Sequence, residues 1–239
     1  MITAVGVIVP ARDEAELIGD CVAHLRRALA ALPARVERAV CVVADRCADD
    51  TAAIARAEFS GQAAVLTNRR AMTIGDVRRL GCRQVLAMLS EHEPDDTLLL
   101  STDADTTVAA DWALAHLRLA EQGWQAVAGV AELDEPLPPA VALRYAAEHG
   151  RAHGPHGHGN VYAANLGVRG DAYAAVGGFA ALATGEEHDL WRRLGAAGFR
   201  RVHATEPVVT TSARLAGRAQ DGLAALLRGL HEGELPEAS

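Results

Sequence analysis

Two aspartates separated by one residue follow a short apolar run near the middle of the chain. The run covers residues 97–101 and is followed by Asp103 and Asp105. An apolar run of this length is typical of a strand that is buried on both faces of a sheet. Two carboxylates at the end of such a strand can share one divalent cation, because hard cations prefer oxygen ligands. A cation held there can in turn bind a diphosphate.

Polar residues also follow the other strands expected in the first half of the chain. Runs at 5–9, 38–43 and 63–67 are each followed by a segment that contains Asp or Arg. In a doubly wound sheet ligands bind at the carboxyl ends of the strands, so we expect these polar groups to border one site. Neither G-x-G-x-x-G nor G-x-x-x-x-G-K is present, which leaves a cation and arginines to hold phosphates.

Helical patterns alternate with these strands. Asp13 is expected to cap a first helix, with Glu16 three residues later. Further helices are expected from residue 49, up to residue 89 and over 111–122, and a fifth strand at 126–131. This alternation predicts an α/β fold with a mostly parallel central sheet and helices on both faces, in a single domain.

The pattern changes at residue 134, where we place a functional boundary. Prolines and a helix to about residue 148 are followed by the loop 151–159, in which three histidines lie among glycines. The elements expected after this loop are a strand at 161–168, helices from 171 and over 186–197, strands at 201–204 and 208–211, and a last helix ending near 230.

Composition excludes several classes of function. The chain has 239 residues and a formal net charge of -8, which disfavours nucleic acid or an anionic membrane surface as the main partner. All 23 basic residues are arginines, which excludes chemistry that needs a lysine amine. The four cysteines have no C-x-x-C spacing, and no stretch approaches the roughly 18 apolar residues of a membrane span. We therefore expect reduced thiols and a cytoplasmic protein.

Five motifs, taken in order, resemble those of family 2 glycosyltransferases, which have the GT-A fold. They are the segments 7–14, 45–51, 103–105, 164–169 with 176–179, and 185–190. The D-x-D triplet alone is a weak signal, whereas five motifs at plausible spacing are a strong one. The resemblance implies transfer of a sugar from a nucleotide diphosphate sugar to an acceptor hydroxyl, usually with inversion. With the boundary at residue 134, the domain is expected to have a nucleotide-sugar-binding half (1–133), an acceptor-binding half (134–231) and a flexible tail (232–239).

The resemblance assigns the donor site residue by residue. Asp45 would accept a hydrogen bond from the base, and Arg78 would approach the base or a phosphate unless it is a surface charge of its helix. The nucleotide-sugar contacts would be Pro10, Ala11, Arg12, Glu14, Asp45, Arg78, Asp103 and Ala104. Asp105 and Asp103 would bind Mg²⁺ or Mn²⁺, with His203 as a third candidate ligand or else a plain strand histidine.

The acids at 186–189 resemble the motif that carries the general base of the family. Glu187 is assigned this role, with Glu186 and Asp189 as the other candidates, although Asp is more usual at this position. A base must reach the acceptor hydroxyl. The alternative is that the three acids only favour the positive end of the helix that follows.

The acceptor site is implied near Asn165 and Gly167. His156 and His158 of the histidine loop are candidate acceptor contacts, because histidines among Gly and Pro lack the rigid spacing of a structural zinc site. Arg214 and Arg218 either close over the diphosphate or approach the last helix in solvent.

Two rival functions remain open at this point. A nucleotidyltransferase on a similar sheet would need a glycine-rich basic loop after the first strand, which residues 10–14 do not provide. A non-catalytic nucleotide-sugar or metal-binding module would share the site but show no turnover. The sequence names neither the base and sugar of the donor nor the acceptor.

Overall fold

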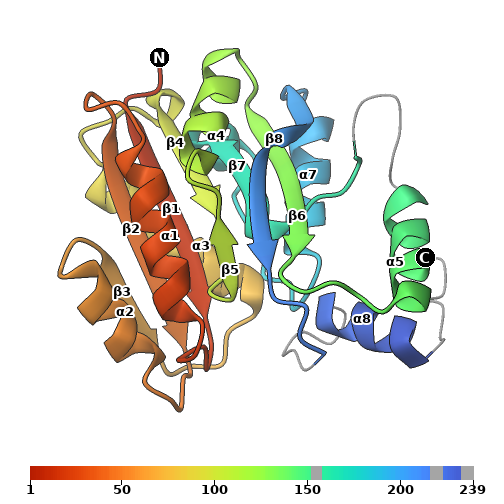
Figure 1. The fold of residues 1–239 in the computed structure, drawn as a ribbon. Helices are drawn as coiled ribbons and strands as arrows, with labels where there is room; N and C mark the ends of the chain where they lie inside the picture. Colours follow the sequence, from red (N-terminus) through yellow and green to blue (C-terminus); the bar gives the residue numbers. More distant parts are fainter. Residues whose placement is uncertain (152–157, 216–222, 233–239) are drawn as a thin grey trace.

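The computed structural model describes residues 1–151, 158–215 and 223–232, with the side chains of 148–151 excepted. One eight-stranded sheet runs through the described residues in the order β3-β2-β1-β4-β7-β6-β8-β5 (Figure 1). The strands are β1 (Ala4–Ala11), β2 (Glu37–Asp45), β3 (Ala64–Asn68), β4 (Thr97–Ser101), β5 (Thr106–Val108), β6 (Ala126–Leu133), β7 (Leu166–Arg169) and β8 (Arg201–Thr211). The expected α/β fold with a mostly parallel sheet is confirmed.

The first four strands of the chain pair in parallel with one another. β1 pairs in parallel with β2 and β4, and β2 pairs in parallel with β3. All four carboxyl ends therefore meet at one edge, which is where the sequence places its polar segments. The second half departs from this pattern, because β7 runs antiparallel to both β4 and β6.

Helices cover both faces of the sheet, as the alternating pattern predicts (Figure 1). The helices of one face are α1 (Ile18–Ala30), α2 (Thr51–Phe59) and α4 (Trp112–Glu121), and those of the other are α3 (Ile74–Met88), α6 (Gly170–Ala175) and α7 (Glu186–Ala196). Strand β1 serves both cores, because Val7 packs on the first face and Ile8 on the second.

Two helices lie beside the sheet. Figure 1 shows α5 (Pro139–Arg151) and α8 (Leu223–Glu232) next to each other at the side of the molecule beyond β6 and β8. Both belong to the half of the chain expected to bind the acceptor. Among the helices of the described residues, none has both the length and the apolar character needed to cross a bilayer.

Three elements differ from the expectations. The strand expected at 161–168 is shorter, because a 3-10 turn (Ala163–Asn165) precedes β7. The strands expected at 201–204 and 208–211 form the single strand β8, which absorbs Pro207 at a bulge opposite Ala128 and Val130. A further short strand, β5, follows the two aspartates and pairs with the end of β8.

The first helix also begins later than expected. Asp13 does not cap it; the helix starts at Ile18, and Asp13 has a φ of 51°. The carboxylate of Asp13 instead accepts a hydrogen bond from the backbone N–H of Ala48 at 2.6 Å. The loop after β1 is therefore shaped by a contact to the loop after β2, which no local pattern reveals.

Candidate functional site

A cavity of about 630 Å³ opens at the carboxyl ends of β1, β2 and β4. It is bordered by every residue that the sequence analysis assigns to the nucleotide sugar and by both aspartates assigned to the metal. These residues are Pro10, Ala11, Arg12, Glu14, Asp45, Arg78, Asp103, Ala104 and Asp105. Glu186 and Glu187 border the same cavity from α7. The structure thus brings the donor candidates and two of the three catalytic candidates together.

Glu14, Asp105 and Arg214 form an ion-pair cluster at one side of the cavity. The guanidinium of Arg214 donates to both carboxylate oxygens of Glu14, at 2.6 and 2.7 Å, and to Oδ2 of Asp105 at 2.7 Å. Burial, and the nearby charges of Asp103 and Glu14, raise the pKa of Asp105 to about 6 against the opposing effect of Arg214. Two carboxylates thus share the single guanidinium of Arg214.

Arg78 forms a second group of ion pairs in the site, with Asp103 and Glu186. Its side chain is 4% exposed, and its Nε and Nη2 donate to Glu186 at 2.9 Å and to Asp103 at 2.7 Å. Its Nη1 donates to the hydroxyl of Ser101 at 2.8 Å. Helix α3 lies close enough to the sheet for this because Gly81 faces Ile8, where any Cβ would collide. Arg78 is thus a buried, fully paired group, and the surface-charge interpretation does not hold.

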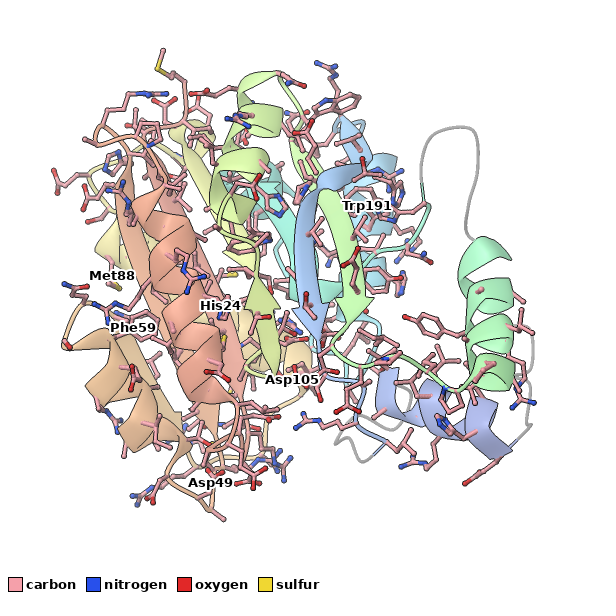
Figure 2. All side chains as sticks on the ribbon, in the orientation of Figure 1. His24, Asp49, Phe59, Met88, Asp105 and Trp191 are labelled. Carbon is pink, nitrogen blue, oxygen red and sulfur yellow. The ribbon has the colours of Figure 1, made fainter. Side chains whose placement is uncertain are left out.

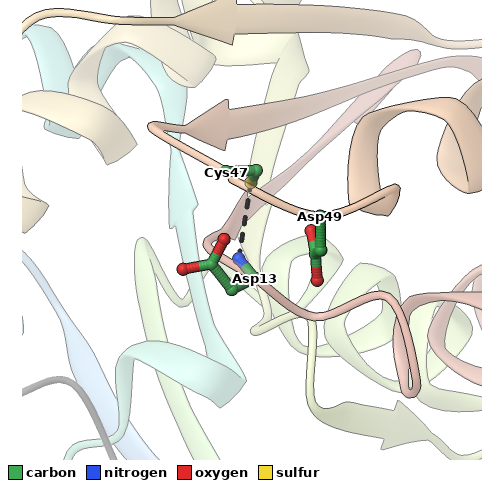
Figure 3. Close-up of side chains that lie close together, drawn as sticks. All are labelled: Asp13, Cys47 and Asp49. Carbon is green, nitrogen blue, oxygen red and sulfur yellow. Dashed lines mark hydrogen bonds between the residues drawn. The ribbon is translucent and has the colours of Figure 1, made fainter.

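The loops after β1 and β2 are fastened together by Asp13, Cys47 and Asp49 (Figure 3). The thiol of Cys47 accepts from the backbone N–H of Asp13 at 3.4 Å, and Asp49 accepts from the backbone N–H of Ala15 at 2.9 Å. The ligand atoms of the three residues lie within 4.8 Å of one another. Since these atoms already bond the loop backbone, we interpret the cluster as the latch that sets the positions of Arg12 and Glu14.

Asp45 borders the cavity at the end of β2 and is nearly buried, with 9% of its side chain exposed. Its Oδ1 accepts from the Asn68 amide at 2.5 Å, and its Oδ2 lies 3.3 Å from Nη2 of Arg46. Asn68 stands at the end of the neighbouring strand β3, opposite Asp45 in register. The parallel pairing therefore holds this carboxylate at the mouth of the cavity.

The three candidate bases at the start of α7 have three different environments. Burial, followed by the charge of Glu186, raises the pKa of Glu187 to about 7. Glu186 is itself held by Arg78. Asp189 does not border the cavity; it accepts hydrogen bonds from Arg192 and Arg193 at 2.7 Å each, and the bond from Arg193 lowers its pKa. Of the three, Glu187 combines a place in the cavity with a pKa suited to proton transfer near neutral pH.

Asn165 lies in the core, where no part of its side chain is exposed. Its amide NH₂ donates to the carbonyls of Val130 at 2.7 Å and Pro207 at 2.8 Å, on the two sides of the β6–β8 bulge. Its Oδ1 accepts from the indole of Trp112 at 2.8 Å and from Nε2 of His116 at 3.0 Å. These four bonds use the hydrogen-bonding capacity of the amide. The structure therefore places Asn165 behind the site, as a support for β6 and β8.

Gly167 lies beside the same network. A Cβ at this position would stand 2.6 Å from Nδ1 of His116, so the glycine leaves room for that ring. Burial lowers the pKa of His116 to about 4, which keeps the imidazole neutral. Gly167 thus contributes to the core and does not border the cavity.

His158 and His203 are not brought to the aspartates. Nε2 of His158 lies 3.2 Å from the carbonyls of Ala128 and Ala204, and His203 donates from Nδ1 to the carbonyl of Asn160 at 3.0 Å. The ring of His203 packs on Trp191, with the ring centroids 4.8 Å apart.

Asp105 contacts the far end of the strand that carries His203. The backbone N–H of Ser212 donates to the carbonyl of Asp105 at 3.3 Å, and Figure 2 shows Asp105 well apart from Trp191 along the strands. Residues 203 and 211 of β8 lie opposite residues 128 and 133 of β6, so they are separated by roughly 15–20 Å along the sheet. His153, His156, Arg218 and residues 233–239 lie outside the described residues.

Two tyrosines that the sequence analysis does not single out border the other end of the cavity. Tyr145 comes from α5 and Tyr162 from the segment before the 3-10 turn, and Leu223, at the start of α8, borders the same cavity. Burial raises the pKa of Tyr145 to about 12, so its hydroxyl stays protonated. All three tyrosines of the chain lie in the half expected to bind the acceptor, and this concentration is the signal that was available in the sequence.

No protein-family model and no curated protein sequence matches the chain. Solved structures do match it. TarS 1–349 of S. aureus with UDP-GlcNAc has a TM-score of 0.64 at 15% identity over 93% of this chain and 61% of that one. A mannosyltransferase from Pyrobaculum calidifontis with GDP-Man and Mn²⁺ has 0.62 at 17% over 95% and 69%. GalNAc-T7 with UDP, GalNAc and Mn²⁺ has 0.66 at 11% over 99% and 49%.

The chain therefore spans about half to two thirds of the length of these glycosyltransferases. At such low sequence identity the likeness concerns the fold and leaves the substrates of the chain open. The TM-scores of 0.62 to 0.66 over 93% or more of this chain show that the likeness extends over nearly the whole fold. The chain has the GT-A fold of these glycosyltransferases.

Proposed function

We propose that the chain is a family 2 glycosyltransferase that moves a sugar from a nucleotide diphosphate sugar to an acceptor hydroxyl with inversion. The observation that carries this proposal is the presence of the donor acids and the candidate base Glu187 in one cavity. Asp103 and Asp105 stand at the end of β4, and Glu187 stands at the start of α7. The nucleotide half would be 1–133 and the acceptor half 134–231, with residues from both bordering the cavity.

The acids of the cavity suit a divalent cation. Glu14, Asp103 and Asp105 offer the hard oxygen ligands that Mg²⁺ and Mn²⁺ prefer, and after burial the charges of Asp103 and Glu14 contribute to the raised pKa of Asp105. Held by Asp103 and Asp105, such a cation would supply Lewis-acid stabilisation of the leaving diphosphate. The Mn²⁺ in the mannosyltransferase and GalNAc-T7 structures supports this choice.

Glu187 is assigned the proton transfer. Its carboxylate removes the proton of the acceptor hydroxyl, and the oxygen forms a bond to the anomeric carbon. The bond from that carbon to the diphosphate oxygen breaks at the same time, and its electron pair leaves with the diphosphate. A pKa raised to about 7 suits Glu187 to accept a proton near neutral pH.

Calorimetry tests the donor half of the proposal. UDP and GDP are titrated into the protein with and without MnCl₂. Binding of one of them should require Mn²⁺, be lost in Asp105→Ala and be reduced less in Asp103→Ala. The control is Asp111→Ala, which removes an exposed carboxylate from the start of α4. Binding that is equal in all four proteins and independent of the cation would contradict the assignment.

Turnover then separates the enzyme from its rivals. Transfer or slow hydrolysis of the matching nucleotide sugar would exclude a non-catalytic binding module, and release of diphosphate from a nucleoside triphosphate would indicate a nucleotidyltransferase instead. That the acceptor group is a hydroxyl and that the protein is cytoplasmic stay predictions.

A further inference from the structure

Arg78 is a buried cation that three separate elements share. It stands on α3, and its three donor nitrogens reach Ser101 at the end of β4, Asp103 just beyond that strand, and Glu186 at the start of α7. Removing a guanidinium from water is costly unless its charge and its N–H groups are all met. Here two carboxylates and one hydroxyl meet them.

The two carboxylates on Arg78 belong to different parts of the site. Asp103 is one of the two acids of the donor end, and Glu186 directly precedes Glu187. Gly185, with a φ of 72°, turns the chain into α7 immediately before these two glutamates. The side chain of Arg78 therefore connects the first turn of α7 to the end of β4.

We propose that Arg78 is a positioning residue that couples the two ends of the site by holding Asp103 and Glu186 on one guanidinium. The coupling depends on the bridge seen here, while the roles of the two ends rest on the proposed function. In this assignment Arg78 does not bind the nucleotide. It fixes the carboxylate beside the base and compensates its charge.

The groups that face Glu187 give the coupling a measurable sign. Two of these groups, Glu186 and His188, come from the same helix, and Nε2 of His188 lies 3.8 Å from a carboxylate oxygen of Glu187. The other two are Arg78 of α3 and Asp103 at the end of β4. Glu186 and Asp103 favour the protonated form of Glu187, whereas Arg78 favours the charged form. Loss of Arg78 should therefore raise the pKa of Glu187, and loss of the charge on Glu186 should lower it.

Carboxyl ¹³C NMR on protein labelled at glutamate Cδ measures this directly, with Glu187→Gln to assign the signal. Arg78→Gln should raise the Glu187 midpoint by about 1 or more, Glu186→Gln should lower it, and the double variant should return towards wild type. Arg78→Lys, which keeps the charge without the fork, should lie closer to wild type than Arg78→Gln. The matched control is Arg79→Gln, since Arg79 is the next residue of α3 but pairs with Asp76 near the surface.

A purely structural role predicts a different result. Arg78→Gln and Glu186→Gln would then lower the stability and leave the Glu187 midpoint where it was, which would overturn the coupling. If Arg78→Gln does not fold, Glu186→Gln alone tests the coupling: a lowered Glu187 midpoint supports it, and an unchanged midpoint overturns it. Titration of UDP and GDP with MnCl₂ into the same samples reports on the proposed function separately: absent binding in the wild type would remove that function without moving the Glu187 midpoints.

Discussion

Arg214 closes a two-pronged ion pair on Glu14, although 200 residues separate them in the chain. The same guanidinium also reaches Asp105, so the end of the sheet strand β8 is tied to the loop after β1 through the acids of the cavity. Of the two interpretations of Arg214 left open by the sequence, the solvated approach to the last helix does not fit this geometry. Arg214 is part of the cavity wall.

Loss of Arg214 should destabilise the protein. Arg214→Gln leaves Glu14, whose side chain is 8% exposed, without its bidentate partner beside Asp105. We expect the free energy of unfolding at pH 7 to fall by about 1–3 kcal/mol in urea titrations. The matched control is Arg35→Gln, whose pair with Glu121 is largely exposed and should be worth less than about 1 kcal/mol. Equal losses in the two variants would show that the Arg214 cluster contributes no more than a surface pair.

Replacement of Glu187 should abolish most of the transfer rate. Glu187→Gln keeps the shape of the side chain but removes the proton acceptor, so single-turnover transfer at saturating donor should slow by roughly 10²- to 10⁴-fold. Donor affinity should be retained. Asp189→Asn is the control, since Asp189 is turned to Arg192 and Arg193. If Glu187→Gln keeps a transfer rate near that of the wild type while Asp189→Asn is folded but inactive, the general base is Asp189.

The same variant should be more stable than the wild type at high pH. The pKa of Glu187 is about 7 in the folded protein against an ordinary value of 4.5, so the folded state binds more protons than the unfolded state between these values. Wild-type stability therefore falls as the pH rises from about 4.5 to 7. Urea titrations should find Glu187→Gln equal to the wild type near pH 4.5 and more stable at pH 8, by on the order of 2 kcal/mol.

Asp189→Asn provides the opposite sign in that experiment. Its lowered pKa means that the charged form stabilises the folded state above the ordinary pKa of an aspartate. This variant should therefore be less stable than the wild type at pH 8 and approach it in acid. If Glu187→Gln instead loses stability at pH 8, as Asp189→Asn is expected to, then the pKa of Glu187 is not raised by burial in the folded protein.

Asn165 should matter for stability more than for the acceptor. Asn165→Ala leaves the carbonyls of Val130 and Pro207 and the indole N–H of Trp112 without partners in the core. We expect a loss of about 3 kcal/mol or more. Asn160→Ala is the control, because Asn160 borders the cavity and uses its backbone carbonyl to hold His203. If Asn165→Ala loses little stability but binds the acceptor more weakly, Asn165 contacts the acceptor directly, as the resemblance implies.

The sequence by itself determined the strands of the first half and the edge at which the donor residues gather. Short apolar runs such as 97–101 predict buried strands from local sequence alone. Parallel pairing of these strands then brings their carboxyl ends to the same edge of the sheet. For this reason Asp45, Asp103, Asp105 and Glu14 could be placed in one cavity without coordinates. The start of α7 at Glu186 was equally readable, because a glycine and a cluster of acids mark a helix terminus.

Only the tertiary structure decided which charge meets which. Arg78 and Glu186 are 108 residues apart, and no local periodicity distinguishes a guanidinium that is buried between two acids from one that points into solvent. The same limit applies to Asn165, whose amide supports a bulge formed by two distant strands. Charge pairing depends on distance in space and on burial, which strengthens each interaction by removing water. Both quantities exist only once the chain has folded.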